Sequence, residues 1–238
     1  MSKGCIYYTD NRLDVPIFSI CQEHIKASGL PITSVSLKPI DFGNNIVLDN
    51  LQPNIITMTT QILTALENAK EDYVFFTEHD VLYHPSHFDF TPPTDNIWYY
   101  NNHVWRWKYP YDFAITYKLT SLSGLCVNRK MAIDHYKLRL KFMYECDWRD
   151  KESGHEPRWG RRIGYEPGTK KRRRGGLTDE EHLTWKSELP NIDIRHGNTF
   201  TKTKCDLRDF IHKPSPEDWK EKPAFQIEGW NLKKLFNL

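Results

Sequence analysis

The chain has 238 residues, which is long enough for one domain with a full hydrophobic core. Its 33 basic residues nearly balance its 31 acidic ones, so the net charge of +2 gives no overall case for a nucleic-acid or membrane-surface partner. The five cysteines contain no C-x-x-C pair, which argues against a disulfide framework or a zinc knuckle and favours a reducing, cytoplasmic setting. No apolar run approaches a membrane span or a signal peptide.

The first half of the chain predicts alternating strands and helices. Residues 5–8 form an apolar run that ends at a polar turn, and residues 15–27 have the spacing of a helix with Pro16 in its first turn. A strand over 32–37, a loop over 38–45, a helix over 58–70 and a strand over 73–77 follow. This β-α-β-α-β order predicts an α/β fold with a mixed, mostly parallel central sheet flanked by helices.

Two carboxylates stand where the last of these strands ends. Tyr73 to Phe76 are aromatic or β-branched, as expected of a strand covered on both faces, and Glu78 and Asp80 follow two residues apart. On an extended chain such residues point to the same side. Ligands of open α/β sheets gather at the carboxyl ends of the strands, and oxygen ligands suit Mg²⁺ or Mn²⁺. The pattern therefore predicts a divalent-metal site.

The second half predicts shorter elements. Strands are expected near residues 98–100, 104–107, 113–119 and 124–127, as antiparallel additions to the sheet, and a helix is expected over 131–144. A Gly-, Arg- and Lys-rich stretch over 149–176 is interpreted as a mobile loop. Thr178 and Glu181 have the spacing of a capping box, which predicts a short helix through Trp185. A last strand is expected over 192–194.

With these elements in order, residues 4–200 resemble the nucleotide-sugar glycosyltransferases of the GT-A fold. Those enzymes end a central strand in a D-x-D-type motif that holds a divalent ion on the sugar-nucleotide diphosphate, and Glu78-His79-Asp80 stands in the matching context with Glu in the first position. The resemblance implies that Asp80 is a metal ligand. It leaves Glu78 open as a second metal ligand or as a group that binds the donor sugar.

A second motif supports the same resemblance. The run from Gly175 through Glu181 is similar to the Gly-Gly and acidic cluster that opens the catalytic helix of β-1,4-galactosyltransferase-like enzymes. There a carboxylate acts as the base on the acceptor hydroxyl, which must lose its proton on attack. The resemblance implies Glu180 or Asp179 as the base. By itself, an acidic run at the start of a helix is ordinary favourable charge.

The resemblance also implies the remaining site residues. His196 follows the last strand, where the family commonly supplies a histidine to the metal. The donor nucleotide is expected at residues that follow the first two strands, namely Thr9, Asp10, Asn11, Arg12, Asp41, Gly43 and Asn44. A single catalytic domain is expected over 1–205, with a C-terminal extension over 206–238 that packs on it.

The expected function is a metal-dependent, inverting glycosyl transfer from a nucleotide sugar to an acceptor hydroxyl. A nucleic-acid acceptor such as a hydroxymethylated DNA base is one hypothesis, because five consecutive basic residues precede the acidic motif: Lys170, Lys171, Arg172, Arg173 and Arg174. A glycan is the other hypothesis. Two further classes stay open, a metal-dependent phosphohydrolase or nuclease and a non-catalytic nucleic-acid-binding protein. The phosphohydrolase lacks an evident further carboxylate on a neighbouring strand end.

Overall fold

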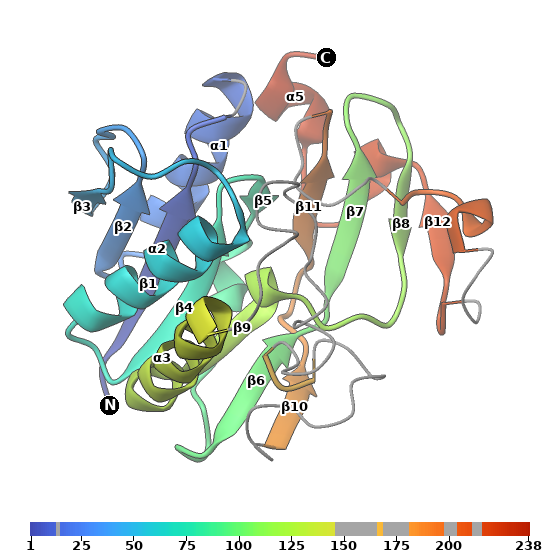
Figure 1. The fold of residues 1–238 in the computed structure, drawn as a ribbon. Helices are drawn as coiled ribbons and strands as arrows, with labels where there is room; N and C mark the ends of the chain where they lie inside the picture. The colour runs from blue at the N-terminus through green and yellow to red at the C-terminus, as the bar shows by residue number, and fades with distance from the viewer. Residues whose placement is uncertain (13–14, 146–165, 169–180, 198–203, 211–215) are drawn as a thin grey trace.

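A computed structural model describes residues 1–12, 15–145, 166–168, 181–197, 204–210 and 216–238. These residues form a seven-stranded sheet and a five-stranded sheet (Figure 1). The first has the order β10-β6-β9-β4-β1-β2-β3 and the second β12-β8-β7-β11-β5. The α/β class and the mostly parallel central sheet are therefore confirmed, while the second sheet was not expected.

The seven-stranded sheet contains the predicted β-α-β-α-β half. Its strands are β1 (Lys3–Thr9), β2 (Ile32–Ser36), β3 (Asn44–Val47), β4 (Tyr73–Glu78), β6 (Ile97–Asn101), β9 (Leu125–Asn128) and β10 (Glu181–Trp185). β3, β2, β1 and β4 pair in parallel, and β9 is antiparallel to both β4 and β6. β4 thus lies in the middle of the sheet, and its carboxyl end lies beside that of β1.

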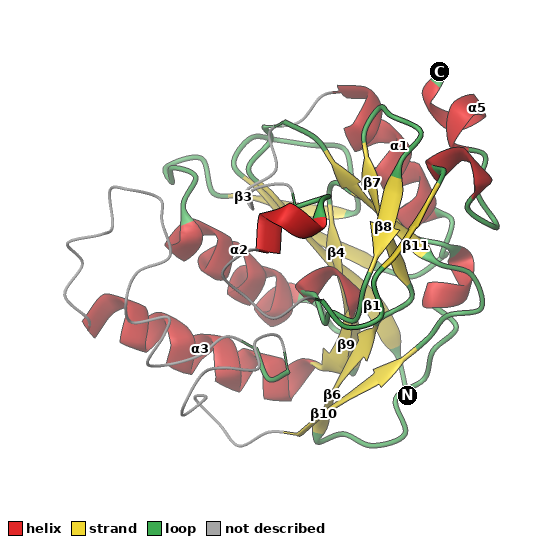
Figure 2. Cartoon of the chain, turned by 90° about the vertical axis from the view of Figure 1, so that its right-hand side faces the viewer, coloured by secondary structure: helices red, strands yellow, loops and turns green. Residues whose placement is uncertain are grey.

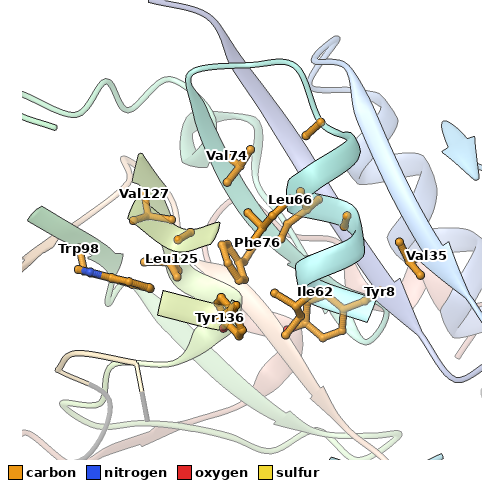
Figure 3. Packing of buried hydrophobic residues seen from close by; sticks show 14 of the residues in the cluster. Tyr8, Val35, Ile62, Leu66, Val74, Phe76, Trp98, Leu125, Val127 and Tyr136 are labelled. Carbon is orange, nitrogen blue, oxygen red and sulfur yellow. The ribbon is translucent and has the colours of Figure 1, made fainter. Parts of the chain in front are cut away.

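Helices cover both faces of this sheet because its strands alternate between two cores. α2 (Ile55–Asn68) and α3 (Arg129–Glu145) lie side by side on one face (Figure 2). They pack on Ile6, Val74 and Phe76, among others, and Figure 3 shows Phe76 beside Tyr136 of α3. The other face contributes Cys5, Tyr7 and Phe75 to a second core, which includes Ile25 of α1 (Val15–Lys26). Full burial of a Phe side chain contributes about 2–3 kcal/mol of stability.

The five-stranded sheet stands beside the first. Its strands are β5 (Val81–Leu82), β7 (Val104–Lys108), β8 (Ala114–Thr116), β11 (Asn191–Arg195) and β12 (Lys220–Lys222). β5 follows β4 after a two-residue turn and pairs with β11, so one continuous segment joins the two sheets. α1 belongs to this sheet's core as well, because Ile17 and Cys21 pack against Ile192 and Ile194.

The C-terminal segment supplies part of that core. Ile227, Trp230, Leu232 and Phe236 are buried against Trp107, the last two from the short helix α5 (Leu232–Phe236). The indole N–H of Trp230 donates to the carbonyl of Pro190 at 2.7 Å. The tail therefore packs on the rest of the chain through apolar side chains and adds β12 to the sheet.

The predicted helix through Trp185 is wrong. Residues Glu181–Trp185 form β10, which pairs in parallel with β6 over five residues. The capping-box spacing competes here with Thr184 and Trp185, which favour a strand, and pairing with the edge of the sheet decides the outcome. The predicted second-half strands are present, but β7 and β8 lie in the second sheet. No helix of the described residues is long and apolar enough to cross a membrane.

Candidate active site

The candidate site lies where β4 leaves the first sheet and β5 enters the second. Glu78 is the last residue of β4, and Asp80 lies in the turn before β5. The Tyr8 hydroxyl donates to Glu78 Oε1 at 2.7 Å, and the Glu78 backbone N–H donates to the Tyr83 hydroxyl at 3.0 Å. The backbone N–H of Ile194 in β11 donates to the Asp80 carbonyl at 2.8 Å. The two predicted carboxylates are therefore held by backbone and tyrosine contacts at the junction of the two sheets.

Burial and neighbouring negative charges disfavour the charged forms of both carboxylates. Burial raises the pKa of Glu78 to about 8, with a further upward contribution from Asp80. Burial, followed by the charge of Asp193, raises the pKa of Asp80 to about 7. Arg195 acts in the opposite direction on both pKa values but does not restore them. Buried carboxylates with raised pKa values are characteristic of functional sites.

A third carboxylate comes from the neighbouring sheet. Asp193, in the middle of β11, is 5% exposed and forms an ion pair with Arg195. The Nε atom of Arg106, on β7, lies 3.8 Å from Asp193 Oδ2, and the Arg106 side chain is 3% exposed. Three acidic side chains thus face two arginines in this cluster, so its formal charge is negative.

The predicted proximity of His196 to the carboxylates is present in the structure. His196 directly follows β11, is 5% exposed, and has its Nε2 atom 3.8 Å from Asp80 Oδ2. Two donors on one Mg²⁺-sized ion, each at about 2.1 Å, are at most about 4.2 Å apart, so this pair can share an ion. Among the described residues, no group of three or more His, Cys, Asp or Glu side chains is arranged to hold a metal. Asp80 and His196 would suit a divalent ion whose other ligands are phosphate oxygens, which is how proteins usually bind Mg²⁺.

The residues predicted to bind the nucleotide after β1 hold the neighbouring turns together. Asn11, with a φ of 63°, accepts through Oδ1 from the backbone N–H groups of Leu37 and Lys38, both at 2.9 Å. Thr9 is buried, and its hydroxyl oxygen lies 2.8 Å from Nδ1 of His79. Asp10 and Arg12 form an ion pair with each other. The β1 turn is therefore tied to the end of β2 and to the Glu78–Asp80 turn.

The predicted residues after β2 lie one strand further from the carboxylates. Gly43 has a φ of 64°, and a Cβ there would lie 2.4 Å from the Ile32 carbonyl oxygen, so the turn requires glycine. Asp41 and Asn44 are exposed on either side of this turn. The structure gives them no contact with Glu78 or Asp80, and their role in binding a nucleotide stays a prediction.

Other predicted residues lie outside the described part of the chain. These are the candidate bases Asp179 and Glu180 and the basic run Lys170, Lys171, Arg172, Arg173 and Arg174. A separate hollow of about 360 Å³ lies at the opposite, amino end of β4, beside Glu71, Tyr73, Asp95 and Arg129. It is distant from the carboxylates along the whole length of the strand and is not part of the candidate site.

Sequence reasoning missed Asp193, Arg106 and the two tyrosines. One signal for Asp193 was available, because an acidic residue between Ile192 and Ile194 in a strand must either face solvent or have a partner inside. Arg195 two residues later, on the same side of the strand, is that partner. Arg106 lies between two tryptophans in β7, and only the parallel pairing of β7 with β11 brings it to Asp193.

No protein-family model and no curated protein matches the sequence. Two solved structures are similar in fold. One is a glycosyltransferase involved in the glycosylation of the major capsid of PBCV-1, with a TM-score of 0.43 and 10% identity over 78% of this chain and 82% of that one. The other is the bifunctional IspDF from Campylobacter jejuni, with a TM-score of 0.42 and 8% identity over 91% of this chain and 55% of that one. Both similarities are too low to assign a function to this chain.

Proposed function

We propose that this chain is a glycosyltransferase that moves a sugar from a nucleotide-sugar donor to an acceptor hydroxyl. The observation that carries the proposal is the convergence of Glu78, Asp80 and His196 at the carboxyl end of the central strand β4, with Arg195 beside them. Ligands of α/β sheets bind at this edge. The donor diphosphate is expected over the Asp80 turn, with the nucleoside toward the β1 turn at residues 9–12.

The charges of the cluster match a diphosphate and a divalent cation together. Glu78, Asp80 and Asp193 outnumber Arg106 and Arg195, and a bound divalent cation would balance the negative charges that Glu78 and Asp80 carry once they lose their protons. Asp80 and His196 would hold the ion, and Glu78 would accept a hydrogen bond from the donor sugar. Bound there, Mn²⁺ or Mg²⁺ supplies positive charge that stabilises the departing diphosphate. Arg195 is placed to add a second positive charge on the same side.

The reaction forms a bond between the acceptor oxygen and the anomeric carbon and breaks the bond from that carbon to the phosphate oxygen. The nucleoside diphosphate leaves with the bonding electrons, and the acceptor hydroxyl gives its proton to a base. Glu180 or Asp179 is the base implied by the resemblance to β-1,4-galactosyltransferase-like enzymes. A base on the acceptor side makes direct displacement with inversion the expected course.

A metal-dependent phosphohydrolase is the second candidate, and Asp193 is the observation that favours it. Hydrolases with two metal ions need several carboxylates around the ions, and Asp193, in the middle of β11, brings a further carboxylate close to Asp80. Against it, Asp193 is already engaged by Arg195 and Arg106. Hydrolysis would release inorganic phosphate or a nucleoside monophosphate, whereas glycosyl transfer releases a nucleoside diphosphate.

The test is a panel of nucleotide sugars and nucleoside diphosphates, each with Mn²⁺, Mg²⁺ or EDTA. We expect one nucleotide family to raise the melting temperature only with metal, and its nucleotide sugar to release the nucleoside diphosphate when an acceptor is present. Acceptors include oligosaccharides and DNA that contains hydroxymethylated bases. Asp80→Asn should lose the metal-dependent shift, while Asp134→Asn, an exposed aspartate on α3, should keep it.

The product identifies the reaction class. Release of inorganic phosphate or a nucleoside monophosphate, with the same dependence on Asp80, would transfer the assignment to a phosphohydrolase. A melting temperature that no nucleotide changes at millimolar concentration, with or without metal, would remove the basis for both enzymes.

A further inference from the structure

A layered group of side chains next to the candidate site has no role in the proposed reaction. The guanidinium carbon of Arg106 lies 4.3 Å from the centroid of the Tyr117 ring, and Tyr117 stacks on Trp219 at 5.7 Å with an interplanar angle of 16°. Phe210 meets both rings edge-on, at 5.6 and 5.9 Å. We call Tyr117, Phe210 and Trp219 the aromatic stack. Arg106 is buried, whereas all three rings are partly exposed.

The aromatic stack is built from three separate segments that other contacts hold in place. Tyr117 follows β8, and Trp219 precedes β12, which pairs with β8 at the edge of the second sheet (Figure 1). The backbone N–H of Lys118 donates to the Glu217 carbonyl at 2.8 Å. Phe210 ends the short turn Leu207–Phe210, where the Asp209 carboxylate accepts from two backbone N–H groups. The rings are thus fixed before any ligand arrives.

Arg106 joins the aromatic stack to the carboxylates. The same guanidinium that lies over Tyr117 has its Nε atom 3.8 Å from Asp193 Oδ2, and Asp193 is the charge that contributes to the raised pKa of Asp80. Nε and Nη1 of Arg106 have no hydrogen-bond partner among the described residues. The Arg106 side chain therefore lies between the aromatic stack and the candidate site, and it has N–H donors that no described residue accepts from.

We propose that the aromatic stack binds the acceptor of the transfer reaction and that this acceptor is a neutral carbohydrate. The ligand's role as the acceptor rests on the proposed function, whereas the binding of a carbohydrate does not. Partly exposed aromatic faces bind the apolar faces of pyranose rings as they bind other flat ligands. The indole N–H of Trp219 donates to Glu221 Oε1 at 2.8 Å, which places a carboxylate at the ring edge to accept hydrogen bonds from sugar hydroxyls.

The charges around the aromatic stack distinguish a sugar from a nucleic acid. Lys118 pairs with Glu217 at 3.1 Å, and Arg208 pairs with Asp206 at 2.6 Å. Two of the cations beside the rings are thus matched by acids, Lys204 lies over the Phe210 ring at 4.9 Å, and Glu221 adds a negative charge at the indole. A single-stranded nucleic acid needs a positively charged groove as well as aromatic platforms. A neutral ligand fits this surface better.

The test measures carbohydrate binding without donor. Saturation-transfer NMR on the full chain, with methyl pyranosides and disaccharides of glucose, galactose and mannose at up to 50 mM, should show transfer to at least one of them. Trp219→Ala should weaken that binding about tenfold, the order expected for a lost stacking contact, and Trp219→Phe should retain most of it. Tyr144→Ala, which removes an exposed tyrosine on α3, is the matched control and should bind as the wild type does.

Nucleotide binding separates this inference from the proposed function. Trp219→Ala should keep the metal-dependent shift by nucleotides, while Asp80→Asn should lose the nucleotide shift and keep carbohydrate binding. If the chain binds a carbohydrate through Trp219 but binds no nucleotide, this inference holds and the proposed glycosyltransferase function is overturned. Three results would overturn the inference: no transfer to any sugar of the panel, equal binding by Trp219→Ala, or Trp219-dependent binding of a single-stranded oligonucleotide in place of sugars.

Discussion

Two sites in this chain place carboxylates away from solvent but shift their pKa values in opposite directions. At Glu166, one carboxylate meets the buried guanidinium of Arg139 and accepts a hydrogen bond from the Tyr136 hydroxyl at 2.6 Å. Burial alone would raise the pKa of Glu166, but Arg139, His135 and Tyr136 together lower it below the ordinary value. At the Glu78–Asp80 turn the pKa values rise instead. Burial raises the pKa at both places, and the difference is that the partners of Glu166 outweigh it whereas Arg195 does not outweigh it at Glu78 and Asp80.

Removal of the cation from the balanced cluster should have the largest effect. Arg139→Leu leaves the Glu166 carboxylate buried without its arginine, and loss of one partner of a buried pair costs about 3–5 kcal/mol. Urea unfolding followed by circular dichroism should show this decrease in the free energy of unfolding. An Arg139→Leu variant as stable as the wild type would mean that the pair is not a structural anchor.

Removal of the acid from the same cluster should change the pH dependence of stability. The folded-state pKa of Glu166 lies below the ordinary value of 4.5, so its contribution is complete above that pH and is lost as the pH falls through the folded pKa. Glu166→Gln should therefore be less stable than the wild type by about 2 kcal/mol at pH 7, and the gap should close at lower pH. Unfolding series at several pH values measure it, and a gap that does not depend on pH would contradict the ion pair.

Removal of an acid from the unbalanced cluster should act in the opposite direction. Asp80→Asn removes a buried charge that is repelled by Asp193, so the free protein should gain about 1 kcal/mol while it loses metal-dependent nucleotide binding. Asp134→Asn, an exposed change of the same chemistry, should alter stability by less than about 0.5 kcal/mol. A clear loss of stability in Asp80→Asn would show that the carboxylate is structural and would weaken the site assignment.

Local patterns were sufficient for most of the first half of the fold. Residues 3–78 contain the predicted strands and helices with ends that shift by a few residues, because each is a long segment with one clear period. The strand β3 was missed, because it begins within the turn-rich segment that was predicted as a loop over 38–45. The β10 error has a different cause. The residues from Glu181 to Trp185 carry both a helix-start signal and a strand composition, and only their pairing with β6, some 80 residues earlier, selects the strand.

Like the fold, the candidate site could be predicted from the sequence only in part. Glu78 and Asp80 are marked by the strand that precedes them, and His196 by the strand that it follows. Asp193, Arg106 and the aromatic stack depend on which strands of the second sheet are neighbours, and that order is set by contacts between residues far apart in the chain. A single sequence does not show such contacts.

The helix α1 has a mechanical consequence. Its residues Ile17 and Cys21 lie in the core of the five-stranded sheet and Ile25 in a core of the seven-stranded sheet, and the β4–β5 segment passes from one sheet to the other with only a two-residue turn. Because α1 packs against both sheets, neither sheet can move relative to the other without disrupting one of its two sets of contacts. We therefore expect the two sheets to melt in one cooperative transition, with equal calorimetric and van't Hoff enthalpies.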